Sequence, residues 1–281
     1  MATPYELIAA SKPFRILVGP DKKEFTMHTE LLGRMSKPLR TLVKGDMKEA
    51  KEGVAEWPEI DEGTFIRFWE FAYTGDYRAA EPIIDAPASS EMASGNANTL
   101  IVRLVEETLV EEPCDDVWGG VKSKKKKMQS SNTSKTLKDE MWRQFQDIFN
   151  TEQDKTSAEQ PNNDPSTNYS EVLLSHARLY TFADCYCVDT LMALCLRKLH
   201  GMLKVFKLHG GARVTDVAQL IDYSYKNTIN KTAEPDGLRS MLAAYAACKM
   251  EELWYNIYFQ DILESGEVAK AIIGQMMKRL I

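Results

Sequence analysis

The thiols and one imidazole of the third quarter of the chain are the residues best suited to metal chemistry. Cys185, Cys187, Cys195 and His176 carry sulfur and nitrogen ligands that Zn²⁺ accepts. Structural zinc sites separate paired cysteines by about two to four residues, whereas Cys-x-Cys on a helix turns its two thiols roughly 200° apart. We therefore interpret these cysteines as core residues, and we predict that the chain has no metal site.

Acid–base and phosphate chemistry also lack the residue patterns that they need. His28 ends a strand-like run beside an apolar helix, where a packed or capping histidine is expected more than a general base. The carboxylate pairs Glu106-Glu107 and Glu111-Glu112 lie in a polar stretch with nothing to desolvate them. No glycine-rich phosphate-binding run is present. We predict no catalytic residues, no cofactor and no enzymatic activity.

The bulk composition limits which binding partners and which cell compartments we expect for the protein. A net charge of -6 over 281 residues argues against a broad nucleic-acid-binding surface, which needs a positive field. Five cysteines and no apolar N-terminal run indicate free thiols in a reducing compartment. The apolar stretches are shorter than the about 20 residues that span a bilayer. We expect a protein of the nucleus, the cytoplasm or both, neither secreted nor membrane-bound.

The elements expected near the N-terminus are a hairpin and several helices. Two strand-like runs, 14–18 and 24–28, flank the turn-prone Gly19-Pro20-Asp21 and predict a β-hairpin. Helical spacing follows, and its clearest case is a helix that begins after the cap candidate Asp61 and stops at Gly75. Its predicted buried face consists of Phe65, Phe68, Trp69 and Ala72.

Residues 79–165 interrupt this pattern with a long polar insert. Prolines, small polar residues and segregated charge blocks cannot supply a packed core, so we expect most of the insert to be disordered. An acidic block over 106–116 precedes a basic run, which we interpret either as a solvated charge run or as a nuclear-import candidate. The basic run consists of Lys122, Lys124, Lys125, Lys126 and Lys127.

One part of the insert differs from the rest. Residues Thr136 to Asn150 place Leu137, Met141, Trp142, Phe145, Ile148 and Phe149 along one helical stripe. Such a stripe favours docking on the chain's own core, and the alternative is binding in the groove of a partner.

The remainder of the chain is predicted to be helical. Helices are expected from a Ser170 cap, from Asp189, across residues 217–224 and from an Asp236 cap, with another across residues 253–258 and a last one after residue 267. No internal repeat accompanies them, which disfavours a solenoid.

In order and spacing, these blocks resemble the BTB/POZ domain family, and more closely the fungal single-domain BTB proteins. The resemblance rests on Phe14-Arg15-Ile16-Leu17-Val18-Gly19, Phe25-Thr26-Met27-His28, Gly45-Asp46-Met47-Lys48-Glu49-Ala50, Phe71-Ala72-Tyr73-Thr74-Gly75-Asp76-Tyr77, His176-Ala177-Arg178-Leu179-Tyr180 and Phe182-Ala183-Asp184.

The resemblance implies an α+β protein with the BTB/POZ fold, a short sheet capped by helices, together with an appended C-terminal helical region and a long low-complexity insert. The domain would comprise residues 1–78 and, after the insert at 79–165, the closing helices at 166–205, followed by a helical region at 206–281.

The resemblance also implies a function in protein–protein interaction, as a scaffold or a cullin ubiquitin-ligase adaptor. In such adaptors a hydrophobic residue followed two positions later by a glutamate contacts the cullin, and Met47 and Glu49 match this pattern. The plainer alternative is an exposed loop with Met47 folded against the core. A nuclear regulatory protein acting through homotypic association is the second function considered. We expect protein partners, with homodimerisation left open, and neither nucleic acid nor membrane.

Overall fold

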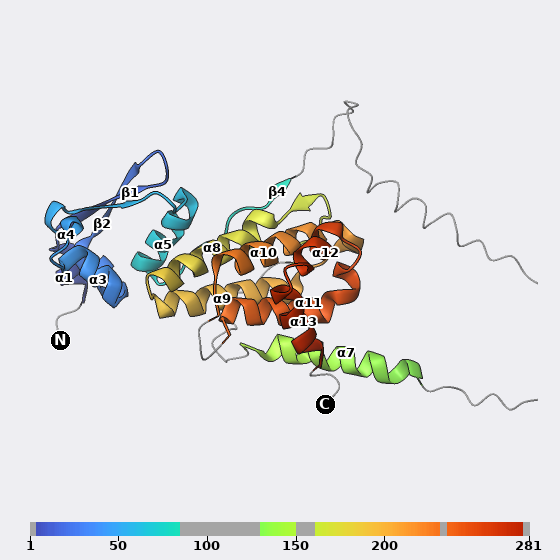
Figure 1. Ribbon diagram of the computed structural model, residues 1–281. Helices are drawn as coiled ribbons and strands as arrows, with labels where there is room; N and C mark the ends of the chain where they lie inside the picture. The colour runs from blue at the N-terminus through green and yellow to red at the C-terminus, as the bar shows by residue number, and fades with distance from the viewer. Residues whose placement is uncertain (1–3, 85–129, 150–160, 231–234, 278–281) are drawn as a thin grey trace, which may run out of the picture.

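The computed structural model describes residues 4–84, 130–149, 161–230 and 235–277. It is a mixed α+β structure, mainly helical, with a small sheet in an N-terminal lobe (residues 4–84) and a helical body formed by α8 to α13 (Figure 1). Within the described ranges, every helix falls short of the length and apolar character that crossing a bilayer requires. The N-terminal lobe contains α1 (Pro4–Ala9), β1 (Pro13–Val18), β2 (Lys23–His28), α2 (Thr29–Met35), α3 (Lys37–Lys44), α4 (Lys48–Glu52), β3 (Val54–Trp57), α5 (Glu62–Thr74) and β4 (Ile83–Ile84).

The predicted hairpin is confirmed. Strand β1 pairs antiparallel with β2, with Phe14 opposite Met27 and Ile16 opposite Phe25. Alternate residues of β1 are buried, as expected for a strand with one face on a core. On its other side β1 pairs in parallel with β3, which gives the strand order β2-β1-β3. A parallel pair needs a crossover, and α2, α3 and α4 supply it.

Helix α5 is confirmed with both of its predicted ends. The Asp61 carboxylate accepts the Thr64 N–H at 2.9 Å, and this bond satisfies a backbone donor that the helix itself leaves unpaired. Gly75 ends the helix at φ 80°, a left-handed conformation that glycine adopts without a steric cost, and donates its N–H to Phe71. Phe65 and Phe68 are buried against Trp57 of β3, which joins the helix to the sheet.

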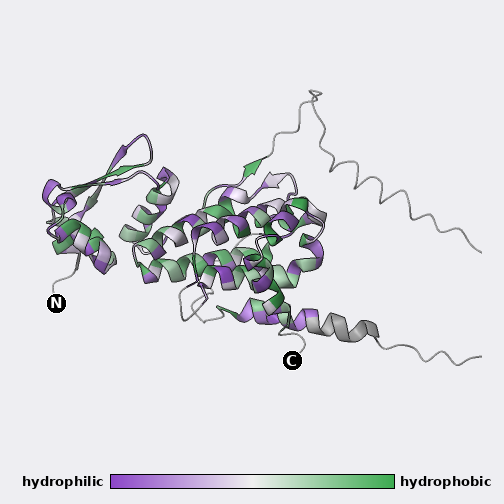
Figure 2. Ribbon diagram, in the orientation of Figure 1, coloured by the Kyte–Doolittle hydropathy of each residue, from purple (hydrophilic) through white to green (hydrophobic). Residues whose placement is uncertain are grey.

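The helical body begins after residue 160. Helices α8 and α9 form an antiparallel pair, α10 packs on α8, and α11 packs on both α10 and α13. Apolar side chains of these helices form the interior. Figure 2 shows hydrophobic and hydrophilic residues alternating along their ribbons. The body contains β5 (Thr167–Asn168), which pairs with β4, then α8 (Ser170–Cys185), α9 (Asp189–Val205), η2 (His209–Gly211), α10 (Val214–Asn227), α11 (Gly237–Leu253), α12 (Ile257–Leu263) and α13 (Glu267–Met277).

Of two predicted helix caps and one predicted helix in this body, one cap is confirmed, and the other cap and the helix are wrong. Asp236 does cap α11, accepting the Arg239 N–H at 3.0 Å. Ser170 is instead the first residue of α8, and its hydroxyl donates to the Asp216 carboxylate. The single helix expected over 253–258 is also wrong, because α11 ends at Leu253 and Asn256 caps a new helix, α12.

The helix predicted within the insert is α7 (Ser130–Asp147), longer at its N-terminal end than the expected Thr136–Asn150. It docks on its own chain, along one side of the helical body (Figure 1). Phe145 is buried against Tyr245 of α11, and its carbonyl lies 2.6 Å from Nε2 of His200 on α9. The interpretation of this stripe as a self-docking face is therefore confirmed.

The N-terminal lobe and the helical body share one apolar cluster. Phe182 of α8 contacts both Trp57 and Phe68, at ring-centroid distances of 5.3 and 4.7 Å. Beyond α5, the chain inserts Tyr77 into the body, where its hydroxyl lies 2.7 Å from Nδ1 of the buried His176. The lobe is thus held on the helical body by aromatic packing, by this buried hydrogen bond, by the pairing of β4 with β5 and by the contacts of Lys198 with Asp76 and with the Tyr77 carbonyl.

Candidate partner-binding surface

Helix α4 carries the two residues singled out by the sequence. It is a single helical turn between α3 and the strand β3, and Gly53 ends it in a left-handed conformation with φ 67°. Gly53 donates its N–H to the Glu49 carbonyl at 2.9 Å, and the next residue begins β3. Because β3 pairs with the central strand β1, the position of α4 is set by the sheet rather than by a free loop.

Met47 occupies the N-cap position of α4 in an extended conformation. Its side chain is 54% exposed, and α4 itself has no buried residue. The alternative in which Met47 folds against the core is therefore wrong. An exposed thioether on an ordered turn offers a flexible apolar contact to another surface.

Glu49 lies two residues further on and is half-buried. In the described ranges, no ion pair or side-chain hydrogen bond of Glu49 is found, whereas its neighbours Lys48 and Glu52 pair with each other at 3.8 Å. One turn thus presents an apolar group and a carboxylate. A pair of this kind can place an apolar contact and a charge-assisted hydrogen bond side by side.

The sequence did not predict a second exposed apolar surface, which lies on α5. On α5, Trp69 was predicted to be buried with Phe65 and Phe68, but it is 40% exposed. At about 100° per residue, Trp69 lies about 40° to one side of Phe65, while Phe68 and Ala72 lie on the other side, toward the core. Ile66, which is also exposed, falls on the same side as Trp69.

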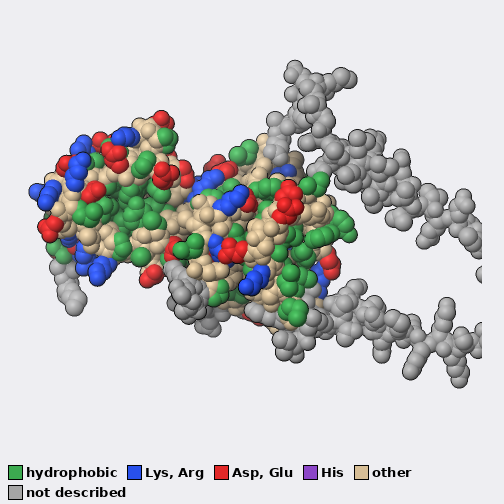
Figure 3. Space-filling view, viewed as in Figure 1, with side chains coloured by type: hydrophobic (Ala, Val, Ile, Leu, Met, Phe, Trp, Pro, Cys, Tyr) green, Lys and Arg blue, Asp and Glu red, His purple; other side chains and the backbone are tan. Residues whose placement is uncertain are grey.

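The edge strand β2 supports this exposed side of α5. Trp69 donates its indole N–H to the Thr26 carbonyl at 3.3 Å and stacks on Tyr73 at 4.4 Å between ring centroids. Tyr73 in turn bonds to Nδ1 of His28 at 2.8 Å, so the expectation of a packed histidine is confirmed, although its side chain makes no cap hydrogen bond. Hydrophobic side chains gather on the visible face of the lobe, with charged ones around them (Figure 3).

The cysteines and His176 are not brought together. His176 and Cys195 are buried near Tyr77, whereas Cys185 and Cys187 are exposed where α8 ends, which corrects their interpretation as core cysteines. Burial raises the pKa of the Cys195 thiol to about 12. Among the described residues, no group of His, Cys, Asp and Glu has the arrangement of a metal site.

The nuclear-import candidate Lys122 and Lys124–Lys127 lies outside the described residues, as do the acidic pairs of the insert. The structure therefore does not test the interpretation of the lysine run or of the acidic pairs.

No protein-family model matches the chain, and no curated protein matches it either.

Proposed function

We propose that the chain is a non-catalytic protein-interaction module with a BTB/POZ-like fold, and that it acts as a scaffold or as an adaptor of a cullin ubiquitin ligase. Met47 and Glu49 are its proposed partner contact. The observation that carries the proposal is the exposure of Met47 on a turn fixed to the central sheet.

The order of elements supports the proposed fold. The resemblance predicts a short sheet capped by helices, and its hairpin and its capped helix before Gly75 occur in the expected order; the parallel third strand between them was not predicted. Helix α8, which pairs with α9, then packs against α5 and buries Phe182 on the aromatic residues of the lobe. A sheet of three short strands has little core of its own, and α5 and α8 provide the remaining cover.

The composition of the α4 turn supports the proposed contact. Residues that dominate interfaces combine an apolar group that fills a pocket with neighbouring charge that fixes orientation. Met47 and Glu49 offer both within three residues, on backbone that the sheet holds in place. Little conformational entropy is then lost from the backbone when a partner binds.

The test is a binding titration of the full chain with the N-terminal region of a cullin. Met47→Ala combined with Glu49→Ala should weaken binding at least tenfold, because both the apolar contact and the charged contact are lost. The matched control is Lys48→Ala with Glu52→Ala, which removes an exposed ion pair from the same turn and should leave the affinity within about twofold.

Two results would end this proposal. One is binding by the Met47/Glu49 double variant as tight as that of the wild-type chain. The other is the absence of any cullin binding by a wild-type chain that is folded by circular dichroism.

A second candidate is homotypic association, favoured by the N-terminal helix α1. Tyr5 and Leu7 are exposed on this helix, which packs on α2. If copies associate through α1, Tyr5→Ser with Leu7→Ser should convert a dimer into a monomer in light scattering after size-exclusion chromatography. A wild-type chain that is monomeric at all concentrations would exclude this candidate.

A further inference from the structure

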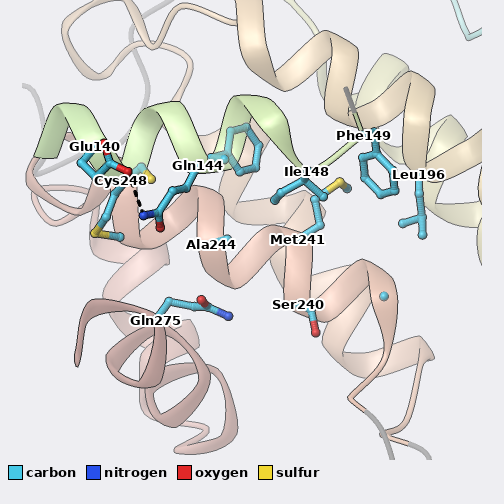
Figure 4. A pocket seen from close by; sticks show the side chains of 13 residues that line it. Glu140, Gln144, Ile148, Phe149, Leu196, Ser240, Met241, Ala244, Cys248 and Gln275 are labelled. Atoms are coloured by element: carbon cyan, nitrogen blue, oxygen red, sulfur yellow. Dashed lines mark hydrogen bonds between the residues drawn. The ribbon is translucent and has the colours of Figure 1, made fainter. Parts of the chain in front are cut away.

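A hollow of about 670 Å³ lies between α7, α11 and α13 (Figure 4). These helices are distant from the α4 turn (Figure 1). Its apolar wall is formed by Met141 and Phe145 of α7, by Ile148 directly after α7, and by Leu196 of α9 and Met241 of α11. This volume falls within the range of about 300–1,000 Å³ that is typical of small-molecule sites. Such sites also share a predominantly apolar lining with a few polar groups.

The hollow arises because the α7 segment contacts α11 at Phe145 but is separated from it near Ile148. Phe145 packs on Tyr245 with 5.6 Å between ring centroids. Ile148, three residues later on the same stripe, is 45% exposed although it faces the body, since it borders the hollow. On the opposite wall, Ser240 and Ala244 are too short to reach it. Water in such a space has few hydrogen-bond partners.

The charges around the hollow select the chemistry of a ligand. Among its described lining residues there is no lysine or arginine, and Glu140 is the sole charged group. Gln144 and Arg143 already bind the Glu140 carboxylate, at 3.1 and 2.6 Å. An anionic ligand would meet this carboxylate and no cation among the described lining residues. The Ser240 hydroxyl and the Gln144 amide can still bond to a neutral polar group.

We propose that this hollow binds a neutral, mainly apolar molecule with one hydrogen-bonding group, such as a long-chain alcohol or a sterol. Displacement of poorly bonded water by apolar surface would drive binding. A partner helix, with a diameter of about 10–12 Å, would require α7 to leave its contact with Tyr245. The site is separate from the Met47 turn, so it stands or falls independently of the proposed function.

The experiment measures binding of the neutral apolar dye Nile red to the full chain. We expect saturable binding of one dye per chain, with competition by 1-dodecanol. Dodecanoate, which has the same chain length but a negative charge, should need at least tenfold higher concentration to displace the dye, because the described lining lacks a cation.

Two filling variants locate the site. Ile148→Trp adds bulk at a half-exposed position just after α7, and Ala244→Phe adds it from α11. Each should weaken dye binding at least tenfold. Ile273→Trp is the control, since Ile273 is exposed on α13 and does not line the hollow, and its dye affinity should be unchanged. Circular dichroism melting verifies that each variant is folded.

Several results would overturn the inference. These are equal dye affinity in the folded filling variants and the control, displacement by dodecanoate as effective as by the alcohol, or no saturable binding by the wild-type chain. Binding that arises only after removal of residues 278–281 would assign the hollow to the chain's own end and would equally overturn it.

Discussion

The N-terminal lobe and the helical body are stabilised by different kinds of buried group. In residues 4–84, apart from the Tyr77 hydroxyl that bonds to His176 of the body, Thr64 is the one polar side chain that is buried, and its partner is the neighbouring cap Asp61. The core of the lobe is otherwise aromatic and aliphatic. The described residues from 161 onward bury many more polar side chains, namely Asn162, Thr167, Ser170, Ser175, His176, His200, Asp216, Ser224, Thr228, Asp236 and Arg239.

The buried polar groups of the body form directional hydrogen bonds between helices. Arg239 donates to the Thr228 hydroxyl at 2.8 Å and to the Tyr225 carbonyl at 2.8 Å, and it pairs with Glu267 of α13. Asp236 caps α11 and also accepts the Tyr180 hydroxyl at 2.8 Å. Because an unpaired buried polar group is costly, these bonds specify one arrangement of α8, α10, α11 and α13.

Because their buried groups differ, the two regions should respond to different perturbations. Apolar burial is not directional and does not depend on proton binding, so the lobe should be sensitive to lost volume. The body should be sensitive to pH and to changes that preserve shape but remove a hydrogen-bonding atom.

The largest effect is expected from a cavity in the lobe. Phe68→Ala removes a fully buried ring that contacts Trp57 and Phe182, and it should lower the free energy of unfolding by about 3–5 kcal/mol. Urea unfolding measures this loss, which should be the same at pH 5 and pH 7. The control Ile66→Ala, at an exposed position of the same helix, should cost below about 1 kcal/mol. Equal losses for the two variants would contradict an apolar core beneath α5.

The next effect is a loss of stability in acid that originates in the body. Burial, with Lys198 and Arg67 contributing, lowers the pKa of His176 from 6.5 to about 3. The unfolded chain then binds a proton that the folded chain does not, so stability is complete above pH 6.5 and falls toward pH 3. The loss is about 1.4 kcal/mol for each pH unit in this window.

Comparison with His176→Gln isolates this contribution. Glutamine can still bond to the Tyr77 hydroxyl but does not titrate, so the variant should lose less stability between pH 6.5 and 4.5 than the wild-type chain. Urea unfolding at several pH values measures both slopes. Identical slopes would place the acid sensitivity elsewhere and weaken the comparison of the two regions.

The smallest of the three effects concerns the cap of α11. Asp236→Ala removes the cap and leaves the Tyr180 hydroxyl without its acceptor, and it should cost about 2 kcal/mol. Asp236→Asn retains an oxygen for the cap and should recover most of this loss. Thermal melting of both variants distinguishes them. If alanine and asparagine proved equivalent, a directional role of this side chain would be excluded.

Local signals in the sequence were sufficient for much of the lobe. The hairpin follows from two apolar runs around Gly19, and α5 follows from a cap at Asp61 and a stop at Gly75, all of which depend on neighbouring residues. Periodicity also identified the docking face of α7. It did not predict the exposure of Trp69 or of Ile148, since a stripe of apolar residues says nothing about how wide the opposing surface is.

For the candidate site too, one part could be predicted from the sequence and another part depended on the tertiary structure. The Met47 and Glu49 pattern was visible in the sequence, but the exposure of Met47 depends on how α4 is held between α3 and β3. The hollow under α7 had no sequence signal, because its walls come from α7, α9, α11 and α13.

By itself the sequence determined the β1–β2 hairpin, the positions of most of the longer helices and where several of them begin and end, because capping, turn chemistry and apolar spacing act over a few neighbouring residues. Only the tertiary structure decided which apolar residues remain exposed, that Cys185 and Cys187 lie at the surface, and where a space remains between helices. The physical reason is that burial depends on the fit between surfaces that are distant along the chain, and this fit is established only when they pack.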